Sequence, residues 1–216
     1  MTEIASRDRM IAAAVTLFAR SGFNGITTKD IAHSANVSES NIFRYFPSKR
    51  DLFIAAVDSE LGKLSVRAEV LARVANAEAP QVALRTLFEL ITDTVVNSPE
   101  LVRLLNFSAL ELGSDMEPVY RKHLDAIVAA SAKNFTKWSR EYGFHDLSAR
   151  VTVLSFVATV VLLQNFYQVF TGSVLPFPSV KSAADEYAEL WYRVLSIAPQ
   201  SDSRSSETVL AGVSEY

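Results

Sequence analysis

Residues 28–45 read TKDIAHSANVSESNIFRY and contain two short helical patterns joined by four residues, 35–38. This spacing is typical of a helix-turn-helix motif. A close helix crossing needs a small residue on the first helix, which Ala32 supplies, and Ile42 supplies a buried aliphatic side chain on the second. The turn needs a left-handed residue, and Asn36 is one of the few types that tolerate that conformation. The stretch therefore predicts a helix-turn-helix.

The second helix of this motif has a polar and an apolar face. At 100° per residue from a cap at Ser38, an arc of about 140° carries the polar side chains Ser40, Asn41, Arg44 and Tyr45. The opposite, packing side carries Ile42, Phe43 and Phe46. A helix of about eight residues is about 12 Å long, which is close to the width of the DNA major groove. The polar face therefore predicts contact with double-stranded DNA.

The residue types on and beside this face suit particular DNA contacts. Arg44 suits the guanine edge, Asn41 suits adenine, and Ser40 suits either a base or a phosphate. Glu39 has two interpretations, because it can interact with the helix dipole or accept a hydrogen bond from cytosine. Lys49 is expected as a mobile charge near the phosphates. The full predicted DNA-binding set is Thr28, Lys29, Ser38, Glu39, Ser40, Asn41, Phe43, Arg44, Tyr45 and Lys49.

The longer stretch ITTKDIAHSANVSESNIFRYFPSKRDLF, residues 26–53, resembles the DNA-binding segment of the TetR/AcrR family of bacterial transcriptional regulators. The preceding FARSGFNG, the TT-x-x-IA, the VS turn and the PSK-x-x-L follow the order and spacing of that family across residues 7–57. The family often has Tyr where this chain has Phe43, so a phosphate-contacting hydroxyl is missing there. The resemblance leaves Tyr45 or Lys49 to compensate.

Hydrophobic periodicity predicts an all-α protein. Helices are expected over 6–21, 28–35, 39–45, 49–76, 80–97, 99–112, 116–142, 147–171 and 182–197. Thr27 and Ser48 each begin a capping box with an acid three residues later. Ser98 is expected to cap a helix because a first-turn Pro and an acid near the helix dipole follow it. These nine helices are assigned to a DNA-binding domain over 1–57 and a larger helical domain over 58–198. The Ser-rich residues 199–216 are expected to be a disordered tail.

The composition is that of a folded protein: 216 residues, 49% hydrophobic and 21% charged, with a net charge of −3. The charge is uneven, because residues 1–57 sum to +2 and the remainder to −5. The absence of cysteine excludes a disulfide framework, a thiol nucleophile and a cysteine-ligated metal. Three scattered histidines give no metal-site spacing, and no cofactor is predicted. A reducing cytoplasm is the expected location.

Two apolar stretches allow other interpretations. Residues 10–19 loosely imitate a signal peptide, but acidic residues precede them and an amphipathic helix fits better. Residues 151–170 carry no charge and are long enough to span a bilayer. Six polar residues interrupt this second stretch, so a helix buried in a core or in a subunit interface is favoured over a membrane-inserted protein.

Residues 58–197 contain no P-loop, G-x-G-x-x-G, G-x-S-x-G, H-E-x-x-H or EF-hand pattern, so an enzyme is disfavoured. The resemblance instead implies an apolar effector pocket and a dimer formed by the last two long helices. Candidate pocket residues are Phe88, Asn106, Phe107, His123, Phe135, Trp138, Gln164, Asn165, Phe166 and Tyr167. Candidate dimer-interface residues are Val153, Val157, Val160, Val161, Tyr187, Trp191 and Val194.

Together these observations predict a homodimeric transcriptional regulator, usually a repressor in the family, that binds a palindromic operator. Two-fold symmetry of the protein would require two-fold symmetry of the DNA. A small apolar or amphipathic effector would bind the helical body and release the operator. The helix over 49–76 begins in the DNA-binding domain and enters the body, so it is the expected lever. An all-α enzyme without a recognisable motif remains an alternative.

Overall fold

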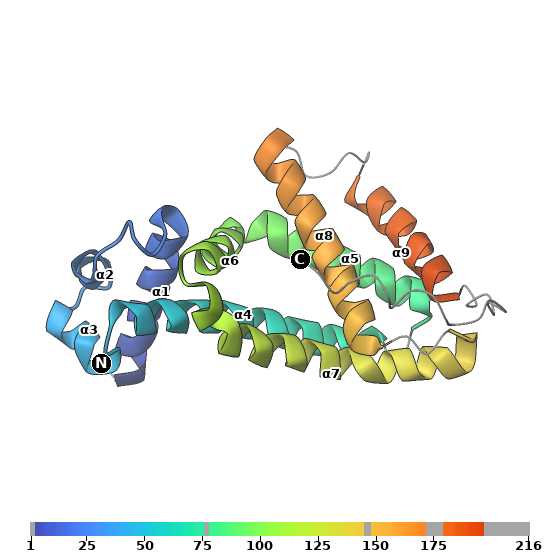
Figure 1. Cartoon of the computed structure of the whole chain (residues 1–216), viewed down its shortest axis with the longest axis horizontal. Coiled ribbons are helices and arrows are strands. Elements are labelled where there is room, and N and C mark those ends of the chain that lie inside the picture. The colour runs from blue at the N-terminus through green and yellow to red at the C-terminus, as the bar shows by residue number, and fades with distance from the viewer. Residues whose placement is uncertain (1–2, 76–77, 145–147, 172–178, 197–216) are drawn as a thin grey trace, which may run out of the picture.

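The computed structural model describes residues 3–75, 78–144, 148–171 and 179–196, and these form nine α-helices and one 3₁₀ helix without a strand. The helices are α1 (Glu3–Ser21), α2 (Thr28–Ser34), α3 (Glu39–Tyr45), α4 (Lys49–Ala75), α5 (Pro80–Asn97), α6 (Pro99–Glu111), η1 (Gly113–Met116), α7 (Glu117–Tyr142), α8 (Ala149–Thr171) and α9 (Val180–Ser196). Figure 1 shows α1–α3 at one end of an elongated molecule and α5, α8 and α9 toward the other.

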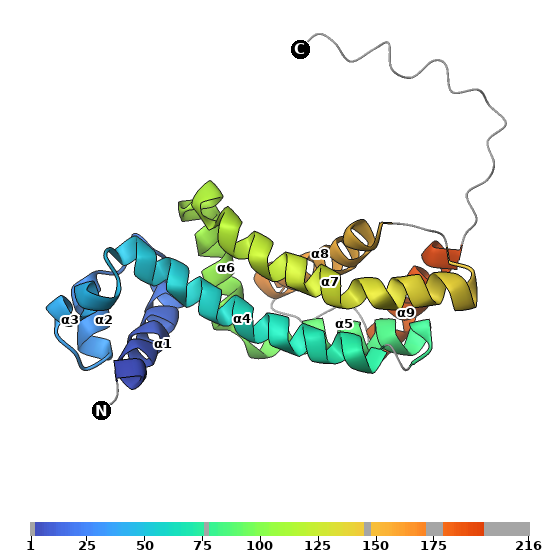
Figure 2. The same ribbon diagram turned by 90° about the horizontal axis from the view of Figure 1, so that it is seen from below.

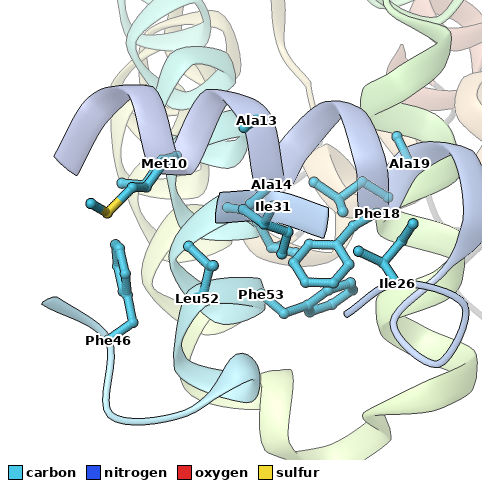
Figure 3. Packing of buried hydrophobic residues seen from close by; sticks show 14 of the residues in the cluster. Met10, Ala13, Ala14, Phe18, Ala19, Ile26, Ile31, Phe46, Leu52 and Phe53 are labelled. Carbon is cyan, nitrogen blue, oxygen red and sulfur yellow. The ribbon is translucent and has the colours of Figure 1, made fainter. Parts of the chain in front are cut away.

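The first three helices pack around one apolar core with the start of α4. Phe18 of α1, Ile31 of α2 and Ile42 of α3 are fully buried in it, together with Leu52 and Phe53 of α4. Figure 3 shows α1 lying across this group, with Phe18 beside Phe53. Their ring centroids are 4.8 Å apart in an edge-to-face arrangement, which is a favoured geometry for an aromatic pair. This core fixes the orientation of α3.

The predicted helix starts are observed, but one predicted cap is wrong. Thr27 accepts a hydrogen bond from the Asp30 amide, and the Asp30 carboxylate accepts one from the Thr27 amide, so the capping box of α2 is complete. Ser48 accepts from the Asp51 amide at 3.2 Å and so caps α4. Ser98 occupies the N-cap position of α6 but makes no side-chain cap, because the same residue also ends α5.

A second apolar core lies in the body of the molecule. It comprises buried residues of α5, α7, α8 and α9, including Phe88, Trp138, Phe156 and Leu195. The two views in Figures 1 and 2 show α4 and α7 running side by side along the length of this body. Helix α4 begins in the first core and then packs along α7, whose Trp138 belongs to the second core, so these two helices together run from one core to the other.

The predicted boundaries agree with the structure to within three residues at each end, and the all-α class is confirmed. The short η1 helix was not predicted. The predicted boundary between residues 57 and 58 falls inside the continuous helix α4. Residues 199–216, predicted to be a tail, lie outside the described residues. Among the helices that the structure describes, none combines the length and the apolar character needed to cross a membrane.

Asn36 offers a test of the helix-turn-helix turn. Its φ of 53° lies in the left-handed region, as predicted. A β-branched residue is strained there by about 1–3 kcal/mol, whereas glycine adopts this conformation freely. We expect Asn36→Val to lower the free energy of unfolding by about that amount in a denaturant titration. The matched variant Asn36→Gly should stay within about 0.5 kcal/mol of the parent, and equal losses from both variants would contradict this role for the backbone.

Candidate nucleic-acid interface and internal cavity

Helix α3 begins with a cap that orders the predicted DNA-contacting surface. The Ser38 hydroxyl accepts a hydrogen bond from the backbone N–H of Asn41 at 3.2 Å. The same hydroxyl lies 3.1 Å from that of Ser40. Ser38 and Ser40 are exposed and Asn41 is partly exposed, so the polar side of α3 faces outward, as its spacing predicts. Ile42 and Phe46 pack inward.

A hydrogen bond joins the first turns of the two motif helices. The Thr28 hydroxyl donates to the Glu39 carboxylate at 2.5 Å. This contact explains the position of Glu39 better than a helix-dipole role alone, because it links α2 to α3. Lys29 lies next to Thr28 and is exposed. The two helix starts, with their backbone N–H groups, therefore lie close enough to form one surface.

Arg44 and Tyr45 form a second ordered pair. The Arg44 guanidinium donates a hydrogen bond to the Tyr45 hydroxyl at 3.0 Å and lies 4.9 Å from the centre of its ring. Arg44 is exposed, whereas Tyr45 is half-buried and packs against the first core. Tyr45 thus supports the arginine on the outer side of α3.

Two predictions about this surface need correction. Phe43 was placed on the packing side of α3, but it is 47% exposed, because it lies only about 60° around the helix from Ser40. Its ring is thereby available for an apolar contact such as a thymine methyl group. Lys49 was expected to be mobile. Its ammonium group instead donates to the Ile26 carbonyl at 2.7 Å and lies 4.4 Å from the centre of the Phe23 ring.

The body contains a cavity of about 70 Å³, or about 770 Å³ when all the space that opens to solvent is counted. Helix α4 contributes the small residues Ala68 and Ala72 to its wall. Glu78, between α4 and α5, and residues of α5, α7, α8 and α9 form the rest. The wall is almost entirely apolar. Its large residues are Leu84, Leu87, Ile127, Phe135, Trp138, Val153, Phe156, Val157 and Trp191, and its polar ones are Glu78, Thr86, Ser131, Asn134 and Thr152.

Two of the ten predicted pocket residues, Phe135 and Trp138, line this cavity. Phe88 is buried beside it and packs on Tyr187, with 4.8 Å between the ring centres. The Gln164 amide donates to the Thr92 hydroxyl at 2.9 Å, so the two buried polar groups pair with each other.

The other predicted pocket residues lie elsewhere. Asn106 and Phe166 are exposed, and Phe107 packs against the first core. The side chains of Asn165 and Tyr167 lie outside the described part of the chain. The sequence analysis missed Ala68, Ala72 and Asn134 because nothing in a helical pattern distinguishes a cavity wall from a packed core.

Comparison with known proteins identifies the motif. Residues 10–56 match the family model of bacterial regulatory proteins of the tetR family. Residues 10–56 are therefore similar to the DNA-binding segment of that family. It is 34% identical over 108 residues to the HTH-type transcriptional repressor NicS of Pseudomonas putida, a match that covers 50% of each chain. The chain thus spans half the length of this curated relative.

Solved structures of TetR-like regulators share the whole fold. A candidate TetR-family transcriptional regulator from Mesorhizobium loti superposes with a TM-score of 0.74 over 90% of this chain and 98% of its own, at 18% identity. The regulator FadR from Bacillus subtilis, solved in complex with stearoyl-CoA, gives a TM-score of 0.70 over 88% and 98% of the two chains, at 16% identity. At these identities the likeness extends to the fold alone.

In the body of this chain His123, predicted for the pocket, instead joins α4 to α7. Its Nε2 lies 2.8 Å from the Asp58 carboxylate and its Nδ1 lies 2.9 Å from the Ser65 hydroxyl. Lys122 also donates to Asp58 at 2.9 Å. Burial alone would raise the pKa of Asp58, but the hydrogen bonds from Lys122 and His123 outweigh it and hold that pKa below its usual value. We name Asp58, Ser65 and His123 the α4–α7 clamp.

Helix α6 and η1 join the body to the N-terminal helices. The Glu111 carboxylate accepts a hydrogen bond from the backbone N–H of Asn24 at 2.8 Å. Arg50 at the start of α4 forms an ion pair with Asp115 of η1. Leu104 and Met116 are fully buried in the first core. The core that orients α3 therefore includes residues beyond the predicted boundary at residue 57.

The predicted dimer residues occupy several environments. Val160 is 0% exposed, and Val153 is buried against the cavity, so a second chain has almost none of their surface left to cover. Val157 and Trp191 line the cavity, while Val161 and Tyr187 pack against the second core. Of the seven predicted residues, Val194 alone is exposed.

A different set of apolar side chains faces outward on the last two helices. On α8 Val151 is exposed and Leu162 is 71% exposed, and their spacing of eleven residues places them on one stripe of the helix. On α9 Leu190 and Val194 are exposed one turn apart. Most of the predicted interface residues thus lie on the inward sides of α8 and α9, whereas other apolar side chains of these two helices face outward.

The α4–α7 clamp predicts a pH-dependent contribution to stability. We expect Asp58→Asn to lower the free energy of unfolding at pH 7 by about 1 kcal/mol, because hydrogen bonds to a charged group contribute up to about 3 kcal/mol and solvent screens this partly exposed carboxylate. Since the folded pKa of Asp58 lies below its usual 3.8, the contribution is present above that pH and lost as the pH falls through the folded pKa. Denaturant titrations between pH 3 and 7 measure it.

The control is Asp125→Asn, which removes the exposed ion pair between Asp125 of α7 and Arg150 of α8. At pH 7 this variant should lower the free energy of unfolding by less than Asp58→Asn does. A deficit of Asp58→Asn that stayed constant down to pH 3 would rule out the carboxylate as its source.

Proposed function

We propose that this protein is a transcriptional repressor that binds a palindromic operator as a homodimer. The observation that carries the proposal is the outward polar side of α3, ordered by the Ser38 cap and by the Arg44–Tyr45 pair. A short helix with a free polar face fits the major groove, and arginine is the commonest reader of guanine there. The repressor NicS, which shares 34% identity over half of the chain, supports repression as the output.

Within this proposal the surface divides into two kinds of contact. Ser40, Asn41, Phe43 and Arg44 lie along α3 and contact base edges. The remaining predicted residues hold phosphates or the motif itself. Thr28, Lys29 and Ser38 lie at helix starts, where hydroxyl and N–H groups suit phosphate oxygens. Tyr45 and Lys49 act indirectly, Tyr45 by supporting Arg44 and Lys49 by fixing the loop at Ile26. Glu39 ties α3 to Thr28.

The homodimer is proposed to form through the exposed apolar stripes of α8 and α9. Contiguous exposed apolar side chains are uncommon on monomeric proteins and mark interaction surfaces. Two such helices from each chain would make a four-helix interface. A two-fold axis there would place the two copies of α3 on successive half-sites of a symmetric operator.

A small apolar effector is proposed to bind the cavity and release the operator. The FadR structure of the same fold was solved with stearoyl-CoA, an amphipathic molecule with a long apolar acyl chain, and this supports an effector with a large apolar part. Helix α4 provides the connection, since Ala68 and Ala72 line the cavity while Leu52 and Phe53 belong to the core that orients α3. An effector that displaces the cavity end of α4 would change the spacing of the two α3 helices, and effector and operator would weaken each other's binding equally.

The first test of this proposal is DNA binding by Arg44→Ala. An operator is selected from random DNA with the parent protein, and both proteins are titrated against it and against a scrambled sequence. We expect Arg44→Ala to lose about 1–3 kcal/mol on the selected operator and much of its discrimination against the scrambled one.

The matched control is Arg140→Ala, an exposed arginine in the last turn of α7. That end of α7 lies at the opposite end of the molecule from α3 (Figure 1). This variant loses the same charge and should retain both affinity and discrimination. An Arg44→Ala protein that bound the operator as tightly as Arg140→Ala would contradict the proposed readout.

The second test addresses the dimer. We expect Leu162→Glu to convert the protein from dimer to monomer at micromolar concentration, because it would place two carboxylates in an apolar interface. Sedimentation velocity measures the mass. Leu110→Glu is the control, since Leu110 of α6 is 83% exposed but lies outside the proposed interface. If both variants sedimented as dimers, the stripe on α8 would not be the interface.

A further inference from the structure

The cavity wall contains a buried hydrogen-bond donor without an acceptor. Trp138 lines the cavity and is only 3% exposed, and its indole Nε1 has no hydrogen-bond partner among the described residues. A buried donor left unpaired costs about 1–3 kcal/mol. Most buried polar groups in folded proteins are paired, so this N–H is the polar feature of the wall that a ligand is best placed to complete.

Each neighbouring polar side chain that can donate already makes a hydrogen bond within the protein. The hydroxyls of Thr86, Ser131 and Thr152 each donate to a carbonyl four residues earlier, at 2.9, 2.9 and 3.1 Å. The side-chain amide of Asn134 donates one hydrogen bond to the Ala72 carbonyl at 2.9 Å. A ligand oxygen would satisfy the indole N–H directly, whereas a water there would also need acceptors for its own two hydrogens.

The charge of the wall limits the ligand further. None of the described residues that line the cavity is Lys, Arg or His, and the ionisable one is Glu78, which is exposed. Burying an anion without a cationic partner costs several kcal/mol or more. A carboxylate, sulfate or phosphate inside the cavity would therefore be strongly disfavoured.

Four aromatic rings shape the cavity. Phe135 and Trp138 meet edge to face with their centres 5.3 Å apart, and Phe156 and Trp191 do the same at 5.4 Å. The rings come from α7, α8 and α9. Aromatic edges and faces attract a further ring in stacked or edge-to-face geometry, beyond the gain from burial alone.

From these three features we propose that the cavity binds an uncharged, ring-bearing apolar molecule whose carbonyl-type oxygen accepts a hydrogen bond from Trp138 Nε1. The proposal rests on the cavity being the effector site of the proposed function and narrows the chemistry of that effector. In this proposal Trp138 orients the ligand and selects for molecules that carry a hydrogen-bond acceptor.

The test compares three naphthalenes of similar size. These are 2-acetylnaphthalene, 2-isopropenylnaphthalene, in which a methylene replaces the carbonyl oxygen, and the anion 2-naphthoate. Both tryptophans of the chain line the cavity, so tryptophan fluorescence reports its occupancy, and equilibrium dialysis gives the affinities. We expect the ketone to bind about tenfold more tightly than the alkene, in line with one hydrogen bond, and the anion to bind more weakly than either.

Trp138→Phe removes the donor and keeps a ring. It should abolish the preference for the ketone while retaining the alkene, and retained alkene binding also shows that the variant is folded. Trp191→Phe is the matched control, and it should affect ketone and alkene alike, so that the preference survives.

The possible failures are distinguishable. Equal binding of ketone and alkene to the parent, a preference that persists in Trp138→Phe, or tightest binding of the naphthoate would each overturn the ligand chemistry and leave the cavity as a binding site. Absence of binding by all three would overturn this inference as a whole. None of these outcomes bears on operator recognition, which the Arg44 variant tests separately.

Discussion

The structure depends on one helix that belongs to both halves of the molecule. Helix α4 has 27 residues, which corresponds to about 40 Å. Leu52 and Phe53 near its start are fully buried in the core that orients α3, and Ala68 and Ala72 near its end form part of the cavity wall. In the proposed function, a displacement of α4 at the cavity would be conveyed along this helix to the N-terminal helices.

The α4–α7 clamp joins the two helices through a single imidazole ring. Asp58 and Ser65 are seven residues apart, so they lie on the same face of α4, and both contact the imidazole of His123. Using both ring nitrogens fixes the orientation of the ring and the register of the two helices. Nearer to the N-terminal helices than the clamp, the Arg50–Asp115 ion pair and the Glu111–Asn24 hydrogen bond hold those helices against α6 and η1. The polar contacts thus lie where the two halves of the molecule meet, and the cavity wall is left almost wholly apolar.

Prediction from sequence succeeded where the determining interactions are local. The Thr27–Asp30 box, the left-handed Asn36 and the inward Ile42 depend on residues within four positions of one another, and all three are observed. Prediction from sequence failed where a side chain contacts a residue that is distant in the chain or where a neighbouring helix changes its role. Lys49 is held by Ile26, His123 by α4, and Ser98 makes no cap because it lies between two consecutive helices.

The sequence by itself therefore determined the helices, the helix-turn-helix and the polar side of α3, since helical period, capping and turn conformation are properties of short segments. Only the tertiary structure decided which apolar side chains became core, cavity or exposed surface. Val153, Val160 and Leu162 share one helix and one chemical character, yet they line the cavity, fill the core and face outward respectively. The difference arises because burial depends on which neighbouring helix covers each face, and that packing involves residues far apart in the chain.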